Sequence, residues 1–152
     1  GDPSSDPAER TQFNIDAAVQ TYLKWITPAK IVVGAPAYGW AWSGVADVNH
    51  GLFQPFTGIP TGSAEDQGSY DYRDIKDDFL PTYQRFWDAE AKSPWLYNPA
   101  TGIMVGYDDP ESLGYRADYV VDNGLGGMLM WELSADDDQH SLVDAIYAGL
   151  TI

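Results

Sequence analysis

Residues 126–132 read Gly126-Gly127-Met128-Leu129-Met130-Trp131-Glu132, and this stretch decides the fold. Two glycines, a continuous apolar run and a final Trp-Glu pair are typical of a short strand that is buried on both faces of a parallel sheet. Ligands of such sheets and of α/β barrels bind beyond the carboxyl ends of the strands. We therefore expect Trp131 to form a flat apolar floor for a ligand, followed by an acidic loop at residues 136–138. A tryptophan packed in the core is the alternative.

A second buried strand is expected at residues 31–37, which are apolar and rich in β-branched side chains. A helix over residues 15–25 precedes it, with Ala18, Tyr22 and Trp25 spaced to lie on one face. An aromatic-rich loop follows at residues 38–42. This order of helix, buried strand and loop is typical of one unit of an α/β barrel.

The same pattern returns in the last third of the chain. Asp109 and Pro110 predict an N-cap and a first helical position, and the helix is expected to run to about residue 123. Gly124 fits a left-handed C-cap, and a last helix is expected over residues 141–150.

Between these parts the sequence changes to short β segments with many glycines and prolines. The clearest signal is a hairpin that joins residues 95–97 to 103–105 through a five-residue loop at 98–102. Seven aromatic residues fall between Phe79 and Tyr107, more than a small core needs, so some are expected to face a ligand. The sequence thus predicts a small α+β subdomain inserted into an α/β fold.

Length and composition limit the possible functions. The chain has 152 residues, 44% of them hydrophobic, which is enough for one domain with a core. Its 23 acidic and 8 basic residues give a net charge of -15, which opposes binding to nucleic acid and to anionic membranes. The lack of cysteine excludes disulfides and Cys-based sites. No apolar run reaches the ~20 residues of a membrane span, and we expect that a targeting signal is absent or was removed.

The residues after the expected strand at 126–132 do not predict a metal site. The spacing of Asp136, Asp138 and His140 is that of a calcium loop, but Ser141 stands where glycine is required and Tyr147 where glutamate is required. A solvated loop is expected instead. The two histidines lack a Ser or Asp constellation for a hydrolytic triad, and we expect no metal and no cofactor.

Four segments, taken together, resemble glycoside hydrolase family 18, the chitinases. They are KIVVGAPAYG at 30–39, DYRDI at 71–75, YDDPES at 107–112 and LGGMLMWE at 125–132. In that family such segments form barrel strand seven, an insertion domain, the start of helix seven, and strand eight.

The resemblance implies an α/β fold, namely the C-terminal portion of a (β/α)8 barrel with an inserted small α+β subdomain. It also implies a secreted enzyme that hydrolyses the β-1,4-N-acetylglucosamine linkages of chitin. The segments would be a barrel segment at 1–42, the insertion subdomain at 43–107 and a second barrel segment at 108–152.

The resemblance further implies four substrate-binding residues. Trp131 would lie under the sugar of the -1 subsite, with Tyr38 in the same cleft. The family's Tyr-Gly is usually followed by arginine, and Trp40 puts a stacking surface there instead. Because Trp40 and Trp42 alternate, we expect one to point inward and the other outward, with Trp40 in the cleft. Asp66 stands near the place of an acidic residue of the family's insertion domain.

The family's signature Asp-x-x-Asp-x-Asp-x-Glu occurs nowhere in these 152 residues. Its glutamate protonates the leaving oxygen while the substrate's own N-acetyl oxygen attacks the anomeric carbon, with retention. We therefore expect no catalytic residue in this chain and no activity from it alone. Two barrel strands by themselves would leave open edges, which predicts a complementary N-terminal barrel fragment or self-association.

Two alternatives stay open. A non-catalytic, chitinase-like lectin would share the aromatic site but would have no general acid anywhere in its assembly. A self-contained interaction domain descended from the barrel would have repacked strands and would bind no chitooligosaccharide.

Overall fold

The structure is a computed structural model that describes residues 14–64 and 66–151. Its helices are α1 (Ile15–Tyr22), α2 (Tyr72–Asp74), α3 (Pro110–Asp122) and α4 (Ser141–Leu150), with short helical turns η2 (Pro28–Lys30), η3 (Asn49–Gly51), η4 (Ile75–Phe79) and η5 (Leu133–Ala135). Its strands are β1 (Val32–Pro36), β2 (Tyr38–Trp42), β3 (Ser69–Asp71), β4 (Gln84–Asp88), β5 (Ser93–Asn98), β6 (Ile103–Gly106) and β7 (Gly127–Trp131). None of the helices in these ranges is long and apolar enough to cross a membrane.

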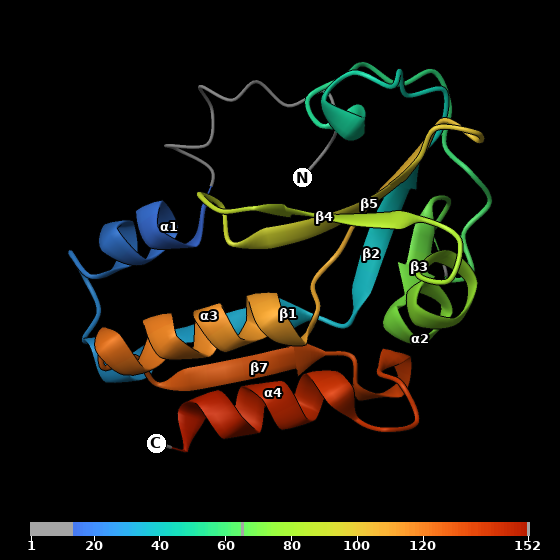
Figure 1. The fold of residues 1–152 in the computed structure, drawn as a ribbon. Coiled ribbons are helices and arrows are strands. Elements are labelled where there is room, and N and C mark those ends of the chain that lie inside the picture. Colours follow the sequence, from blue (N-terminus) through green and yellow to red (C-terminus); the bar gives the residue numbers. More distant parts are fainter. Residues whose placement is uncertain (1–13, 65, 152) are drawn as a thin grey trace.

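Strands β1 and β7 form a parallel pair although most of the chain separates them (Figure 1). The register pairs Val33 with Met128 on one face and Pro36 with Trp131 at the carboxyl end. Helices α3 and α4 lie against this pair, as barrel helices do (Figure 1). The two strands expected at residues 31–37 and 126–132 are therefore confirmed, and they are neighbours.

Only one face of this pair is covered, so the expectation of a strand buried on both faces was wrong for these residues. Val33 is buried and Met128 packs against the core, whereas Val32 and Leu129 on the opposite face are 48% and 52% exposed. Alternating side chains point to opposite faces of a strand, and only the face toward α3 and α4 has a partner among the described residues.

The remaining strands form a five-stranded antiparallel sheet in the order β3-β2-β6-β5-β4. The predicted β5–β6 hairpin is confirmed, but Asn98 pairs with Ile103, so the loop has four residues instead of five. Strand β2 also belongs to this sheet, because Trp40 pairs with Ser69 and with Gly106. We propose on this ground that the barrel segment ends near Ala37 instead of residue 42.

One hydrophobic core joins the two sheets. It combines Ala35 and Leu113 from the barrel segments with Ile75, Leu96 and Val105 from the insertion, all of them almost completely buried. Since each part contributes to the same core, the insertion packs on the barrel segments without a solvent layer between them.

The helix ends follow the sequence signals. Asp109 caps α3 by accepting a hydrogen bond from the N–H of Ser112, whose hydroxyl in turn accepts from the N–H of Asp109. Gly124 is left-handed with a φ of 58°, as predicted. The first helix ends at Tyr22 instead of Trp25, so its predicted C-terminal end was wrong, and Trp25 lies beyond it with 84% of its surface exposed.

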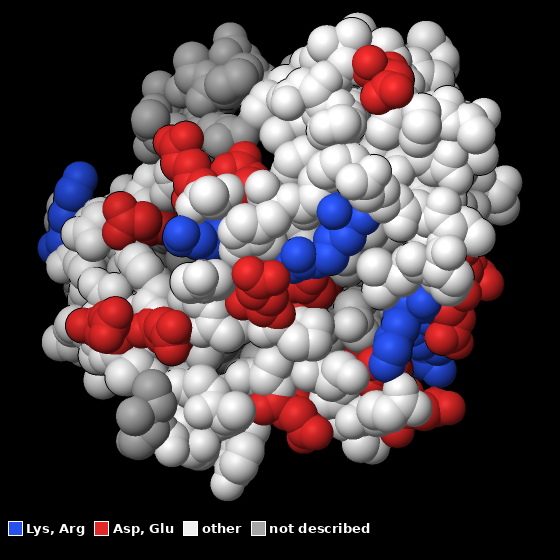
Figure 2. Space-filling view, viewed as in Figure 1, with Lys and Arg blue, Asp and Glu red and all other residues white. Residues whose placement is uncertain are grey.

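On the face drawn in Figure 2, acidic side chains are spread over the surface, and basic side chains lie beside several of them. Among the described residues, two basic side chains form three ion pairs that cross from the insertion to the barrel segments. Arg85 of β4 donates to Asp109 and Glu111 at 2.8 and 2.7 Å, and Lys76 of η4 donates to Asp137 at 2.6 Å.

Candidate binding pocket

A pocket of about 570 Å³ lies between the carboxyl end of β7 and the five-stranded sheet. One wall comes from the insertion and β2, and the other from β7 and the turn η5. Its lining residues are Tyr38, Trp40, Ser63, Ala64, Asp66, Ser69, Asp71, Trp131, Glu132 and Ala135. All four residues singled out from the sequence, Tyr38, Trp40, Asp66 and Trp131, are therefore in one pocket.

Trp131 is fixed through its backbone and free at its side chain. It ends β7 opposite Pro36, and its carbonyl oxygen accepts a hydrogen bond from the N–H of Ala37 at 2.8 Å. Trp131 is 68% exposed among the described residues. The alternative, in which this tryptophan is packed in the core, is therefore wrong. An open indole face at a strand end can stack against the apolar face of a ligand.

Tyr38 and Trp40 come from the same face of β2, because residues two apart on a strand point the same way. Trp40 is 38% exposed, whereas Gly39 and Ala41 on the opposite face are buried. Trp42 shares the face of Trp40, and it packs at the far end of the strand against Phe56, with ring centroids 6.4 Å apart. The expectation that the two tryptophans point to opposite sides was therefore wrong, although Trp40 does line the pocket.

The described part of the pocket contains three carboxylates, and two of them, Asp71 and Glu132, were not assigned from the sequence. Asp66 and Glu132 are exposed, and Asp71 is half-buried. Burial raises the pKa of Asp71 above its ordinary value, the carboxylates of Asp74 and Glu132 raise it further, and Arg73 opposes the rise. The signal for both residues was their position next to a residue singled out from the sequence. Glu132 directly follows Trp131 at the end of β7, and Asp71 at the end of β3 pairs with Tyr38 of β2.

Aromatic faces and carboxylate oxygens therefore meet in one cavity, and the described lining has no lysine or arginine. Carboxylates accept hydrogen bonds from hydroxyl or amide donors, and indole faces pack on apolar C–H surfaces. This combination suits a neutral or cationic ligand that carries several hydrogen-bond donors along apolar rings.

The aromatic residues of the insertion do not extend this surface. Trp95, Tyr97 and Tyr107 are buried, and none of the seven aromatics from Phe79 to Tyr107 is among the residues that line the pocket. Trp87 instead packs against Tyr115 of α3 with ring centroids 5.8 Å apart. They form the insertion's own core and its contact with α3, and the expectation that some of them face a ligand stays a prediction.

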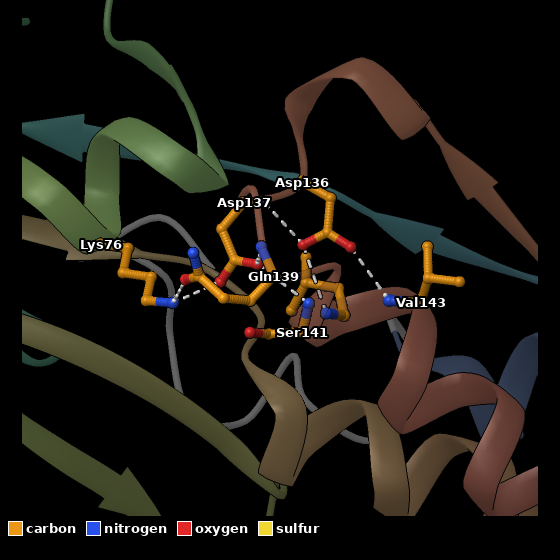
Figure 3. Close-up of polar contacts among 7 residues, drawn as sticks. Lys76, Asp136, Asp137, Gln139, Ser141 and Val143 are labelled. Atoms are coloured by element: carbon orange, nitrogen blue, oxygen red, sulfur yellow. Dashed lines mark hydrogen bonds and ion pairs between the residues drawn. The ribbon is translucent and has the colours of Figure 1, made fainter.

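The acidic loop after β7 has a structural role instead of a ligand-facing or solvated one (Figure 3). The carboxylate of Asp136 accepts hydrogen bonds from the N–H groups of Leu142 and Val143 at 3.2 and 3.0 Å. Asp137 accepts from the N–H of Ser141 at 3.0 Å, and both aspartates are 5% exposed. They satisfy the free N–H groups at the start of α4, where negative charge is favourable. Asp138 alone remains exposed.

Within residues 14–64 and 66–151, no group of three or more His, Asp or Glu side chains is placed to hold a metal ion.

Comparison with known proteins gives a consistent result. A family model described as glycosyl hydrolases family 18 matches residues 2–136. Chitinase A1 of Niallia circulans is 38% identical over 141 residues, which cover 89% of this chain and 20% of that protein. Chitinase B of Serratia marcescens is 33% identical, with 88% of this chain and 31% of that protein covered.

Solved structures agree with the sequence relatives. Chitinase ChiA74 from Bacillus thuringiensis superimposes with a TM-score of 0.85 at 32% identity, over 96% of this chain and 27% of that chain. The chain thus spans between about a fifth and a third of the length of these relatives. The resemblance and the predicted α/β barrel fold class with its insertion are confirmed.

Proposed function

This chain belongs to glycosyl hydrolase family 18, and from that premise we propose that it is the C-terminal part of a chitinase. In this proposal the pocket between β2 and β7 binds a chain of β-1,4-linked N-acetylglucosamine. The relatives named above are chitinases, and the chain covers a minor part of each of them.

The observation that carries the proposal is the convergence of Trp131 and Trp40 on one pocket. Their indoles are 68% and 38% exposed, which is unusual for a side chain of this size unless it contacts a partner or ligand. A pyranose ring presents C–H groups on its faces and hydroxyls at its edges, so it can stack on the indoles while Asp66 or Asp71 accepts from hydroxyl or amide groups.

The mechanism expected for the complete enzyme divides the work between this chain and another part of the protein. The N-acetyl oxygen of the bound sugar attacks the anomeric carbon, and a glutamate protonates the leaving oxygen. That glutamate belongs to a motif that is absent from these 152 residues. The residues of this chain would hold the sugar against Trp131, so that its N-acetyl group lies within reach of the anomeric carbon.

A non-catalytic, chitinase-like lectin is the second candidate, because the exposed indoles of the pocket would serve sugar binding without hydrolysis as well. Both candidates predict sugar binding here, and they differ in whether any part of the assembly supplies the acid. Secretion belongs to the same proposal, since it rests on the family resemblance.

Calorimetric titration of the 152-residue chain with chitotetraose tests the proposal, with cellotetraose as the control sugar that lacks N-acetyl groups. We expect chitotetraose to bind and cellotetraose to bind at least roughly tenfold more weakly, because a lost polar contact in a site costs about 1–3 kcal/mol. No binding of either sugar would refute the sugar-binding role. Release of chitobiose from chitotetraose by an assembly that contains the acid motif would separate the enzyme from the lectin.

A further inference from the structure

The proposed pocket has two walls that come from different parts of the fold. Trp40 and Asp66 belong to the five-stranded sheet and its loops, whereas Trp131 and Glu132 belong to the end of β7. A ligand that stacks on Trp131 meets the opposite wall at the same time. The spacing between the walls therefore decides how well the ligand fits, and a shift of about 1 Å in such a site can cost on the order of 100-fold in rate.

The segment after Trp131 is held at both of its ends. At one end, the carbonyl oxygen of Trp131 accepts from the N–H of Ala37. At the other end, Asp137 accepts from the N–H groups of Gln139 and Ser141, each at 3.0 Å, and is thereby anchored to the start of α4 (Figure 3). These contacts fix the segment to the barrel side of the molecule.

Lys76 is the link from this segment to the opposite wall. Its ammonium group donates to Asp137 at 2.6 Å and to the side-chain oxygen of Gln139 at 2.8 Å, as Figure 3 shows. Lys76 follows Ile75, which is fully buried in the shared core, on the helical segment that leads directly from Asp71 of the pocket. One side chain thus joins the segments that carry the two walls.

The environment of this contact makes it stronger than an ordinary surface ion pair. The Asp137 side chain is only 5% exposed, the Lys76 side chain is 34% exposed, and the carboxylate receives three donors in total. Charge-assisted hydrogen bonds with a buried partner are shorter and stronger than exposed ones.

We infer that Lys76 is a positioning residue of the pocket, which holds the segment after Trp131 at a fixed distance from the wall that contains Trp40. This inference rests on the proposed function, because it assumes that the pocket binds a chitooligosaccharide. Lys76 touches none of the lining groups in the described contacts and acts through Asp137.

Arg85 provides the matched comparison. It also joins the insertion to a barrel segment, through Asp109 and Glu111, and it has a similar exposure of 33%. Its partners lie at the start of α3, which contributes no residue to the pocket lining. A link that only stabilises the fold should behave like Arg85, whereas a positioning link should affect ligand affinity.

The experiment measures chitotetraose affinity by calorimetry and the melting temperature of the 152-residue chain for Lys76→Met, Lys76→Arg and Arg85→Met. We expect Lys76→Met to weaken binding roughly three- to tenfold and Lys76→Arg to regain most of the affinity, since arginine keeps a charged donor for Asp137. Arg85→Met should lower the melting temperature by a similar amount and leave the affinity within about twofold of the parent.

The other possible results contradict either the proposed function or the positioning role of Lys76. If the parent chain binds no chitotetraose, the proposed function fails. If the parent binds but Lys76→Met binds equally well, or if Arg85→Met loses as much affinity, the positioning role of Lys76 fails alone. Should Lys76→Met not fold, Lys76→Gln replaces it, because glutamine retains a shorter neutral donor, and a smaller loss of affinity is then expected.

Discussion

The backbone N–H of Ala37 donates a 2.8 Å hydrogen bond to the carbonyl oxygen of Trp131. Ala37 is completely buried, whereas the indole of Trp131 is 68% exposed. The end of β1 therefore holds the backbone of Trp131 in place without using its side chain. Binding and stability are separable at this position, which makes it suitable for a direct test.

Trp131→Ala should weaken chitotetraose binding at least roughly tenfold and leave the melting temperature nearly unchanged, because stacking surface is lost while little buried area is removed. Trp25→Ala is the matched control, since Trp25 is 84% exposed and lies outside the pocket lining. Calorimetric titration of both variants provides the measurement. Equal affinities for the two variants would contradict the role of Trp131.

Helices α3 and α4 supply a second test, through two glycines with opposite surroundings. A methyl group at Gly114 would have no neighbour within 4 Å, whereas one at Gly149 would lie 2.4 Å from the Cβ of Ala117. Gly114→Ala should raise the free energy of unfolding by about 1 kcal/mol, because glycine costs conformational entropy in a helix. Gly149→Ala should lower it by about 1–3 kcal/mol through overpacking. Urea denaturation of both variants checks the signs, and stabilisation by Gly149→Ala would refute the close α3–α4 contact.

Local patterns were enough to predict the elements that have strong signals. Asp109 and Pro110 marked the start of α3, Gly124 marked its end, and the period of the last helix gave α4 with its observed bounds. These features depend on neighbouring residues alone, so the sequence contains all the information required. Trp131 came from its position at the end of a strand, and Tyr38, Trp40 and Asp66 came from the family resemblance. The structure brings all four together.

The errors arose where a contact distant in sequence decides the outcome. Asp136 and Asp137 looked like a solvated loop, and their burial depends on α4 and on Lys76, which lies far away in the chain. Leu129 looked buried because the strand is apolar on both sides, and its exposure depends on which strands are present beside β7. The hydrophobic pattern shows which faces of a strand are apolar, but it does not show whether other strands cover those faces.

The Lys76–Asp137 contact predicts an acid-sensitive part of the stability. Burial by itself would raise the pKa of Asp137, but the hydrogen bonds from Lys76 and the start of α4 outweigh it and lower the pKa to about 2. A carboxylate with a lowered folded-state pKa stabilises the protein above its unfolded value near 4, and this contribution disappears as the pH falls to about 2. The contribution is on the order of 2 kcal/mol.

Asp137→Asn should remove this dependence, so its free energy of unfolding should change less than that of the parent between pH 4 and pH 2. Asp138→Asn is the control, because Asp138 is exposed in the same loop and should keep the parent's pH dependence. Thermal unfolding across this pH range measures both. Identical pH profiles for the parent and Asp137→Asn would show that Asp137 does not carry the acid sensitivity.

The ion pair of Arg116 and Asp108 leads to a prediction of the opposite sign. Once this pair is broken, the free energy of unfolding should rise, instead of fall, as the pH is lowered. Arg116 donates to both carboxylate oxygens of Asp108 at 2.7 and 2.6 Å, and burial already raises the pKa of Asp108. Arg116→Met leaves a buried carboxylate without its counter-charge, which should cost about 3 kcal/mol at pH 7. A raised carboxyl pKa favours the folded state at low pH, so the deficit should shrink toward pH 5. The double variant Arg116→Met/Asp108→Asn should recover much of the loss, and a deficit that does not change with pH or with the second substitution would contradict this account.

The exposed face of the β1–β7 pair leads to the last prediction. Val32 and Leu129 are about half exposed there, although apolar side chains in a barrel strand are normally covered by neighbouring strands. We expect a polypeptide with the remaining strands of a family 18 barrel, including the Asp-x-x-Asp-x-Asp-x-Glu motif, to bind this face and to produce chitobiose release that neither piece shows alone.

Leu129→Lys should weaken that association and the activity at least roughly tenfold, because it places a charge in the covered interior. Tyr147→Lys, an exposed position on α4, should leave both unchanged. Sedimentation of the mixture and of the chain by itself distinguishes this complementation from self-association, and equal activity of the two variants would show that the β1–β7 face is not the contact.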